Sequence, residues 1–106
     1  MIKNGMRPVH PGDILFEEFM KPAEPPINAN RLAKALEVPA NRITAIIKGQ
    51  RGITGDTAVR LAAFFNTTAE FWMNLQKTYE LRIAEQALPV RVRKHIEQRR
   101  EALATA

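Results

Sequence analysis

The amino-acid sequence predicts an all-α protein, and three observations support this prediction. Hydrophobic residues recur at helical spacing through most of the chain, capping residues and prolines precede these segments, and no segment alternates hydrophobic and polar residues as a half-buried strand does. Of the 106 residues, 45% are hydrophobic and 25% are charged, as in an ordinary globular domain. We therefore expect one helical domain with a modest hydrophobic core.

The first helix is expected to follow a flexible N-terminal arm over residues 1–10, which contains Gly5 and Pro8 and has no hydrophobic periodicity. Pro11 suits a first helical turn, and Asp13 is favourable near the positive end of the helix dipole. Pro22 is incompatible with a helix interior. The sequence therefore predicts a helix that begins near residue 11 and ends before residue 22.

Residues 28–49 have the features of a helix-turn-helix pair. Asn28 is a suitable N-cap for one helix, Pro39 marks a tight turn, and Gly49 can adopt the left-handed conformation that ends a second helix. The second helix of such a pair lies on the surface, where it can enter the major groove of DNA. The alternative is an ordinary helical hairpin whose charged side chains are simply solvated.

Two more helices are predicted before residue 82, which gives five in a DNA-binding domain over residues 11–82. Thr54 and Thr68 are suitable N-caps, and Asn66 tolerates the left-handed conformation between the two segments. The fifth helix can continue until Pro89 interrupts it. Residues 83–106 then form a basic C-terminal extension, which fits an amphipathic helix with too narrow a hydrophobic stripe to fold alone.

The predicted core consists of the hydrophobic side chains that repeat on one side of each segment. They are Ile14, Leu15, Phe19, Leu32, Ala33, Leu36, Ile43, Ile46, Ala58, Leu61, Ala62 and Phe65. In the fifth helix, Trp72, Leu75 and Tyr79 are either core residues or part of a dimer interface, because large side chains of this kind suit both environments. The sequence leaves both interpretations open.

The distribution of charge favours a polyanionic partner. The net charge is +5 at pH 7, and from Arg31 to Arg51 five basic residues stand against the single acidic residue Glu37. Basic side chains placed at phosphates release condensed counterions, and this release supplies affinity for nucleic acid. We therefore expect salt-dependent binding to DNA.

The candidate DNA-contacting residues follow from their positions on the helix pair. The start of the second helix and the turn after it face the base edges, and these positions hold Ala40, Asn41, Arg42, Thr44 and Ala45. The asparagine amide matches atoms N6 and N7 of adenine, whereas alanine and threonine methyl groups suit a thymine methyl. The predicted phosphate-binding residues are Asn28, Asn30, Lys48, Gln50 and Arg51. With two alanines in the groove, specificity is expected to depend on Asn41, Arg42 and DNA shape.

Other classes of function find little support. Cysteine is absent, which excludes disulfides and thiolate metal sites and fits a cytoplasmic protein. His10 and His95 lie near opposite ends of the chain, so we expect solvated side chains, no metal and no cofactor. Neither a nucleophile motif nor a glycine-rich phosphate loop is present, and no segment reads as a membrane span or signal peptide. We therefore expect neither an enzyme nor a membrane partner.

Several motifs together resemble one family. They are His10-Pro11-Gly12-Asp13-Ile14-Leu15, Leu32-Ala33, Val38-Pro39, Lys48-Gly49 with Arg51, Ile53-Thr54, Arg60-Leu61-Ala62 and Glu70-Phe71-Trp72-Met73-Asn74-Leu75-Gln76. Over residues 7–83 the chain resembles HigA-type antitoxins, a group within the Xre, or lambda-repressor-like, helix-turn-helix class. The first and last of these motifs are far more specific than the helix-turn-helix pattern alone.

The resemblance implies a five-helix lambda-repressor-like domain with a C-terminal helical extension. It also implies an antitoxin that forms a homodimer, binds a palindromic operator to repress its own operon, and neutralises a HigB-type RNase toxin by direct binding. The same five base-facing positions are carried over, and of the phosphate-binding positions Lys48, Gln50 and Arg51 are carried over. Glu37 departs from the pattern, because the family usually has glycine there and a left-handed glutamate costs about 1–2 kcal/mol. We therefore expect a turn of different shape.

Two alternative functions remain open at this stage. One is a stand-alone Xre-type regulator without a toxin, and the other is a partner-inhibiting interaction module that does not bind DNA, as the alanine-rich groove surface allows. The extension over residues 83–106 is open as well. It is a solvated charged helix, a toxin-binding segment or an additional phosphate-binding arm.

Overall fold

A computed structural model describes residues 7–105, and no strand occurs within this range. The all-α prediction is therefore confirmed. The elements are α1 (Pro11–Ile14), η1 (Leu15–Met20), α2 (Ala29–Leu36), α3 (Ala40–Ile47), α4 (Gly55–Phe65), α5 (Ala69–Ala87) and α6 (Val90–Thr105). η1 continues α1 as a π-helix, and at its end the Lys21 N–H donates to the Phe16 carbonyl at 2.9 Å.

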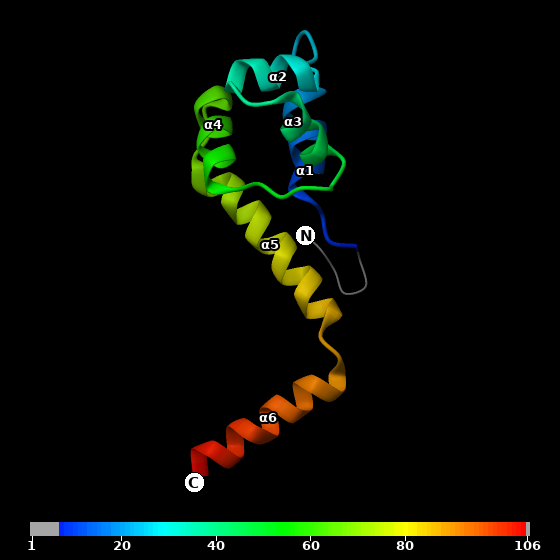
Figure 1. Ribbon diagram of the computed structural model, residues 1–106, viewed down its shortest axis with the longest axis vertical. Coiled ribbons are helices and arrows are strands. Elements are labelled where there is room, and N and C mark those ends of the chain that lie inside the picture. The colour runs from blue at the N-terminus through cyan, green and yellow to red at the C-terminus, as the bar shows by residue number, and fades with distance from the viewer. Residues whose placement is uncertain (1–6, 106) are drawn as a thin grey trace.

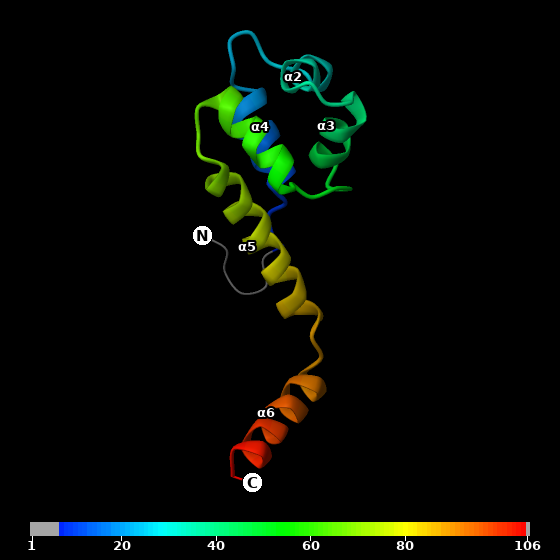
Figure 2. The same cartoon turned by 60° about the vertical axis from the view of Figure 1, so that its left-hand side comes forward.

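The helices form a compact body and a projecting stalk (Figure 1). In the body, α2 packs against α3 and α4, while α5 packs against α4 and α1. The second half of α5 leaves the body, and α6 extends further from it, so that the molecule measures 61 × 26 × 23 Å (Figure 2). Residues 7–105 hold six α-helices rather than the predicted five, and the sixth, α6, lies in the predicted extension.

Local capping chemistry explains where α2, α4 and α5 begin. The side-chain oxygens of Asn28, Thr54 and Thr68 each accept a hydrogen bond from the backbone N–H three residues further along, at 2.8, 3.5 and 3.1 Å. Asn66 ends α4 in the left-handed conformation, with φ of 57°. These four capping predictions are confirmed, because each depends only on residues that are close in sequence.

The core lies between the helices of the body. Its buried hydrophobic residues are Leu15, Met20, Leu32, Ala33, Leu36, Ile43, Ile46, Ile53, Ala58, Leu61 and Trp72. Most were predicted from helical spacing, whereas Met20 and Ile53 were not. Phe19, Ala62 and Phe65 are half-buried and pack against this core, and Ile14 is half-buried.

Trp72 is a core residue of the single subunit, and the interpretation of Trp72 as a dimer contact is wrong. Its side chain is 0% exposed, and its ring lies 4.8 Å from Phe19 and 5.0 Å from Phe71 between centroids. The indole N–H donates to the Thr67 hydroxyl at 2.7 Å, so the one polar atom of the ring is paired. Leu75 and Tyr79 are half-buried, and their role in a dimer stays a prediction.

His10 is buried, contrary to the expectation of a solvated side chain. Its Nδ1 accepts a hydrogen bond from the Gly12 N–H at 2.9 Å and so caps α1, and its ring packs edge-on against Tyr79 at 4.8 Å. Burial lowers the pKa of His10 from its usual value, which favours the neutral ring that this cap requires. Pro8 is buried too, so the part of the predicted arm within the described residues packs on the body. Residues 1–6 of that arm lie outside them.

The turn between α2 and α3 has the usual left-handed shape, and the expectation of a different one is wrong. Glu37 ends α2 with φ of 58° and ψ of 48°, and its N–H donates to the Lys34 carbonyl at 3.2 Å. The Val38 N–H donates to the Ala33 carbonyl at 3.0 Å. The contacts that close the turn therefore impose a conformation that this residue type does not favour.

We expect Glu37→Gly to raise the free energy of unfolding by about 1 kcal/mol. Glycine avoids a left-handed strain of about 1–2 kcal/mol, offset in part by the greater entropy of the unfolded chain. Asn66→Gly is the matched control and should gain less, because asparagine tolerates this conformation. Urea denaturation measures both, and a loss of stability in Glu37→Gly would contradict the left-handed geometry.

Candidate nucleic-acid interface

The outer side of α3 is open to solvent. Ile43 and Ile46 are buried beneath the helix, while Ala40 and Asn41 at its start are exposed. Pro39 is the N-cap residue and supplies no side-chain cap, so the start of α3 presents backbone N–H groups at the positive end of its dipole. This arrangement allows the first turn of α3 to approach a negatively charged groove.

Three of the predicted base-facing residues, Arg42, Thr44 and Ala45, are less exposed than Ala40 and Asn41. Thr44 and Ala45 are half-buried one turn further along, and the Thr44 hydroxyl donates to the Ala40 carbonyl at 3.2 Å. With its hydroxyl directed to the backbone, Thr44 is suited to methyl contacts rather than to donating to a base. Among the five predicted base-facing residues, Asn41 therefore offers an exposed amide that can both donate and accept hydrogen bonds.

Arg42 lies otherwise than expected. Its guanidinium donates to the Asp56 carboxylate at 2.8 Å, and its side chain is 23% exposed. Asp56 also accepts from Arg60 at 3.0 Å, and Arg60 donates in turn to the Leu36 carbonyl at 2.7 Å. This chain of polar contacts joins α3, α4 and the end of α2, and it orients α3 from the side that faces the body.

The Asp56 carboxylate is the centre of that chain. Hydrogen bonds from Arg42 and then from Arg60 hold the pKa of Asp56 below its usual value of 3.8. A carboxylate whose pKa is lower in the folded than in the unfolded state stabilises the fold above the unfolded pKa. That contribution is lost as the pH falls through the folded pKa, so the relevant range lies below about pH 4.

We expect Asp56→Asn to lose this pH dependence. The variant should unfold at a lower temperature than the wild type at neutral pH, and the difference should shrink as the pH falls below about 4, where the wild-type carboxylate is protonated too. Thermal unfolding followed by circular dichroism over a pH series measures the difference. A constant difference at every pH would mean that the carboxylate charge is not what links α3 to α4.

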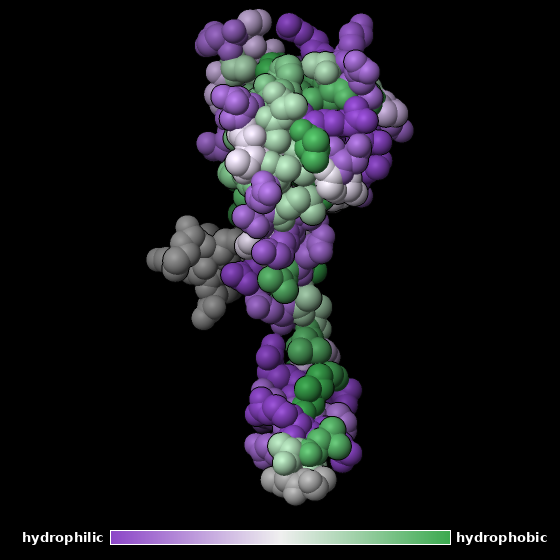
Figure 3. Space-filling view, turned by 90° about the vertical axis from the view of Figure 1, so that its left-hand side faces the viewer, coloured by the Kyte–Doolittle hydropathy of each residue, from purple (hydrophilic) through white to green (hydrophobic). Residues whose placement is uncertain are grey.

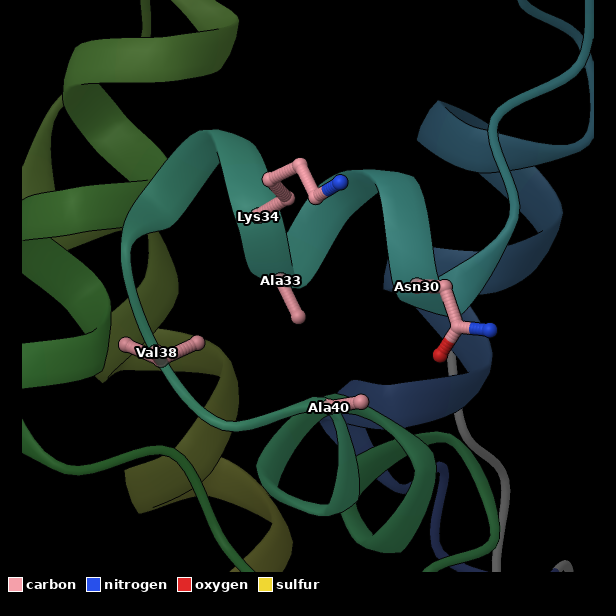
Figure 4. A pocket seen from close by; sticks show the side chains of 5 residues that line it. All are labelled: Asn30, Ala33, Lys34, Val38 and Ala40. Atoms are coloured by element: carbon pink, nitrogen blue, oxygen red, sulfur yellow. The ribbon is translucent and has the colours of Figure 1, made fainter.

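A hollow between the two helices adjoins this surface. An open hollow of about 520 Å³ lies between α2 and α3, and its lining residues are Asn30, Ala33, Lys34, Val38 and Ala40 (Figure 4). Lys34 was not among the predicted phosphate-binding residues. It lies one helical turn after Asn30, and this spacing on one side of α2 could have indicated it. Asn28 is exposed, and its side-chain oxygen serves as the cap of α2.

The loop after α3 carries the remaining predicted phosphate-binding residues. Lys48, Gln50 and Arg51 are all exposed. Gly49 has φ of 75°, and the Gln50 N–H donates to the Ala45 carbonyl at 2.8 Å, so the chain turns back sharply at the end of α3. The two cations Lys48 and Arg51 and the amide of Gln50 therefore lie on the turn that directly follows α3.

Two other kinds of site were sought in the described part of the chain. Over residues 7–105, no group of three or more His, Cys, Asp and Glu side chains is arranged to hold a metal ion. Within the same range, every helix is too short or too polar to cross a membrane.

Comparison with known proteins places this geometry in a class. A family model described as helix-turn-helix matches residues 27–72, from just before α2 into α5. The chain is therefore a helix-turn-helix protein. Virulence-associated protein I of Dichelobacter nodosus is 50% identical over 84 residues, which cover 79% of this chain and 76% of that protein.

Similar solved structures indicate which family of helix-turn-helix proteins the chain belongs to. A structure described as Pseudomonas aeruginosa antitoxin HigA with higBA promoter superimposes with a TM-score of 0.72 at 48% identity, covering 76% of this chain and 86% of that chain. An addiction module antidote protein of a HigA family from Coxiella burnetii gives 0.73 at 50% identity, covering 88% and 95%. The chain belongs to the HigA family of helix-turn-helix antitoxins, as the motifs predicted.

Proposed function

We propose that this protein is a sequence-specific DNA-binding antitoxin. In this proposal it represses its own toxin–antitoxin operon as a homodimer and neutralises a HigB-type RNase toxin by direct binding. The single observation that carries the DNA-binding part is the exposed first turn of α3. The Asn41 side chain is open to solvent there, and the exposed cations Lys34, Lys48 and Arg51 lie on the adjoining segments. The relative from Pseudomonas aeruginosa, whose structure is described as being with promoter DNA, supports the same function.

The residues around α3 divide into three roles in this proposal. Asn41 reads a base edge, while Ala40, Thr44 and Ala45 present methyl groups and a close fit to the groove. The phosphate-binding set comprises Asn28, Asn30, Lys34, Lys48, Gln50 and Arg51. Arg42 contacts Asp56 rather than DNA, and it keeps α3 at a fixed angle to the body.

The stalk is the proposed surface for protein partners. The second half of α5 and α6 expose hydrophobic side chains beside charged ones (Figure 3). These hydrophobic residues are Leu81, Ile83, Val90, Ile96 and Leu103. An isolated 16-residue helix is only marginally stable in water, so α6 gains from docking on another chain. The stalk points away from α2 and α3, which favours a protein partner over an additional contact to the same DNA (Figure 1).

Two measurements on the full chain test the proposed function. Co-expression with a tagged product of the adjacent gene should retain this protein in a pull-down. The purified protein should bind its own promoter fragment with an affinity that falls steeply as salt rises. Promoter binding without retention would indicate the stand-alone regulator, and retention without promoter binding would indicate the interaction module.

A further inference from the structure

The loop between α3 and α4 is held by a buried amide of α5. Gln76 is 7% exposed, and its Oε1 accepts a hydrogen bond from the Ile53 N–H at 2.7 Å. These two residues are 23 positions apart in the sequence, so this contact fixes the loop to a helix on the far side of the core. A buried N–H without a partner is costly, and Gln76 supplies the partner here.

Glu80 determines which way the Gln76 amide faces. The Gln76 Nε2 donates to the Glu80 carboxylate at 2.7 Å, one helical turn along α5. An ionised carboxylate only accepts hydrogen bonds, so the nitrogen of the amide must face Glu80 and its oxygen must face the loop. Glu80, Gln76 and the Ile53 N–H therefore form one directed chain of hydrogen bonds.

The loop lies directly on this amide. A Cβ atom added at Gly52 would be 2.7 Å from the Gln76 Nε2 and 2.9 Å from its Oε1, so a side chain at this position would displace the Gln76 amide. Ile53 beside it is 2% exposed and anchors the loop in the core. The exposed cations Lys48 and Arg51 lie between the end of α3 and this anchor.

We propose that Gln76 is a positioning residue for DNA binding. It holds the α3–α4 loop so that Lys48 and Arg51 present their charges to phosphates, while Glu80 keeps its amide in the required orientation. Gln76 itself is buried and does not touch DNA. This inference rests on the proposed function, because the loop matters in this way only if the protein binds DNA.

The test measures binding of fluorescent operator and scrambled duplexes over a series of salt concentrations. Gln76→Ala should weaken binding to both duplexes alike, by about tenfold. The negative slope of log K against log salt should become shallower by about one to two. A loss of this kind points to phosphate contacts rather than to base reading. Asn74→Ala, which removes an exposed amide from the same helix, is the matched control and should bind as the wild type does.

A second pair of variants separates positioning from mere stability. Gln76→Glu alone places two carboxylates together and should bind weakly. The double variant Gln76→Glu with Glu80→Gln exchanges the two groups at unchanged net charge. Its new carboxylate can accept from both the Ile53 N–H and the new amide, so affinity and salt slope should return to within about twofold of the wild type.

Amide exchange of Ile53 in the free protein reports on the same hydrogen bond without DNA. Exchange should be faster in Gln76→Ala and slow again in the double variant. An unchanged salt slope in Gln76→Ala, or a double variant as weak as Gln76→Glu, would overturn the inference. If Gln76→Ala fails to fold, the inference is tested by comparing the DNA affinity of Gln76→Glu with that of the double variant. If the wild type itself fails to bind the promoter fragment, the proposed function falls as well, which distinguishes the two failures.

Discussion

Replacing Trp72 with alanine is expected to lower the free energy of unfolding by about 3–5 kcal/mol, the usual loss for a fully buried aromatic side chain. The ring is 0% exposed and lies within 4.8 Å of Phe19, measured between centroids, and its N–H is paired with the Thr67 hydroxyl. A domain of this size has a total stability of roughly 5–15 kcal/mol, so the variant should lose a large share of it. Urea denaturation followed by circular dichroism measures the loss.

The control for this variant is Met73→Ala on the next position of α5. Met73 is 37% exposed, and its replacement should change stability by about 0.5 kcal/mol or less. The loss in Trp72→Ala should also be independent of protein concentration, because the contacts lie within one subunit. A loss that grew on dilution would instead place Trp72 between subunits.

Asn41→Ala is expected to cost about 1–3 kcal/mol of binding free energy at the operator and to relax the preference for one base. The reason is that Asn41 carries the exposed amide of the predicted base-facing set, whereas the Thr44 hydroxyl donates to the Ala40 carbonyl. Titration of the variant against operator and scrambled duplexes measures the effect. The loss should be confined to the operator.

Lys48→Ala is the control that distinguishes loss of a base contact from loss of a phosphate contact. A phosphate contact carries no sequence information, so this variant should weaken binding to both duplexes alike and lower the salt slope by about one. If Asn41→Ala also lost the same affinity on both duplexes, Asn41 would not be reading a base.

The predictable part of the fold depends on residues that are close in sequence. Asn28, Thr54 and Thr68 cap their helices through the N–H three positions on, and this chemistry can be recognised without a structure. The buried side of α3 followed from the spacing of Ile43 and Ile46. For the same reason, the two helices predicted within residues 28–49 are present, because the pattern that indicates them is local.

The unpredicted part depends on partners that are distant in sequence. Helical spacing does not reveal that Arg42 contacts Asp56, 14 positions away. It also does not show that His10 packs against Tyr79, which is why His10 was expected to be solvated. Whether a large aromatic such as Trp72 packs inside its own subunit is decided by packing in three dimensions, and the sequence alone left it open.

The polar link from Arg42 through Asp56 to Arg60, together with the buried Ile43 and Ile46, joins α3 to the body through residues other than those proposed to touch bases. Different residues of α3 therefore hold the helix on the body and are proposed to contact the bases. Replacing the exposed residues of α3 should change the DNA sequence that the protein prefers, while the orientation of the helix in the groove stays the same. The DNA specificity of this fold should therefore be changeable by surface substitutions on α3, without substitutions in the core.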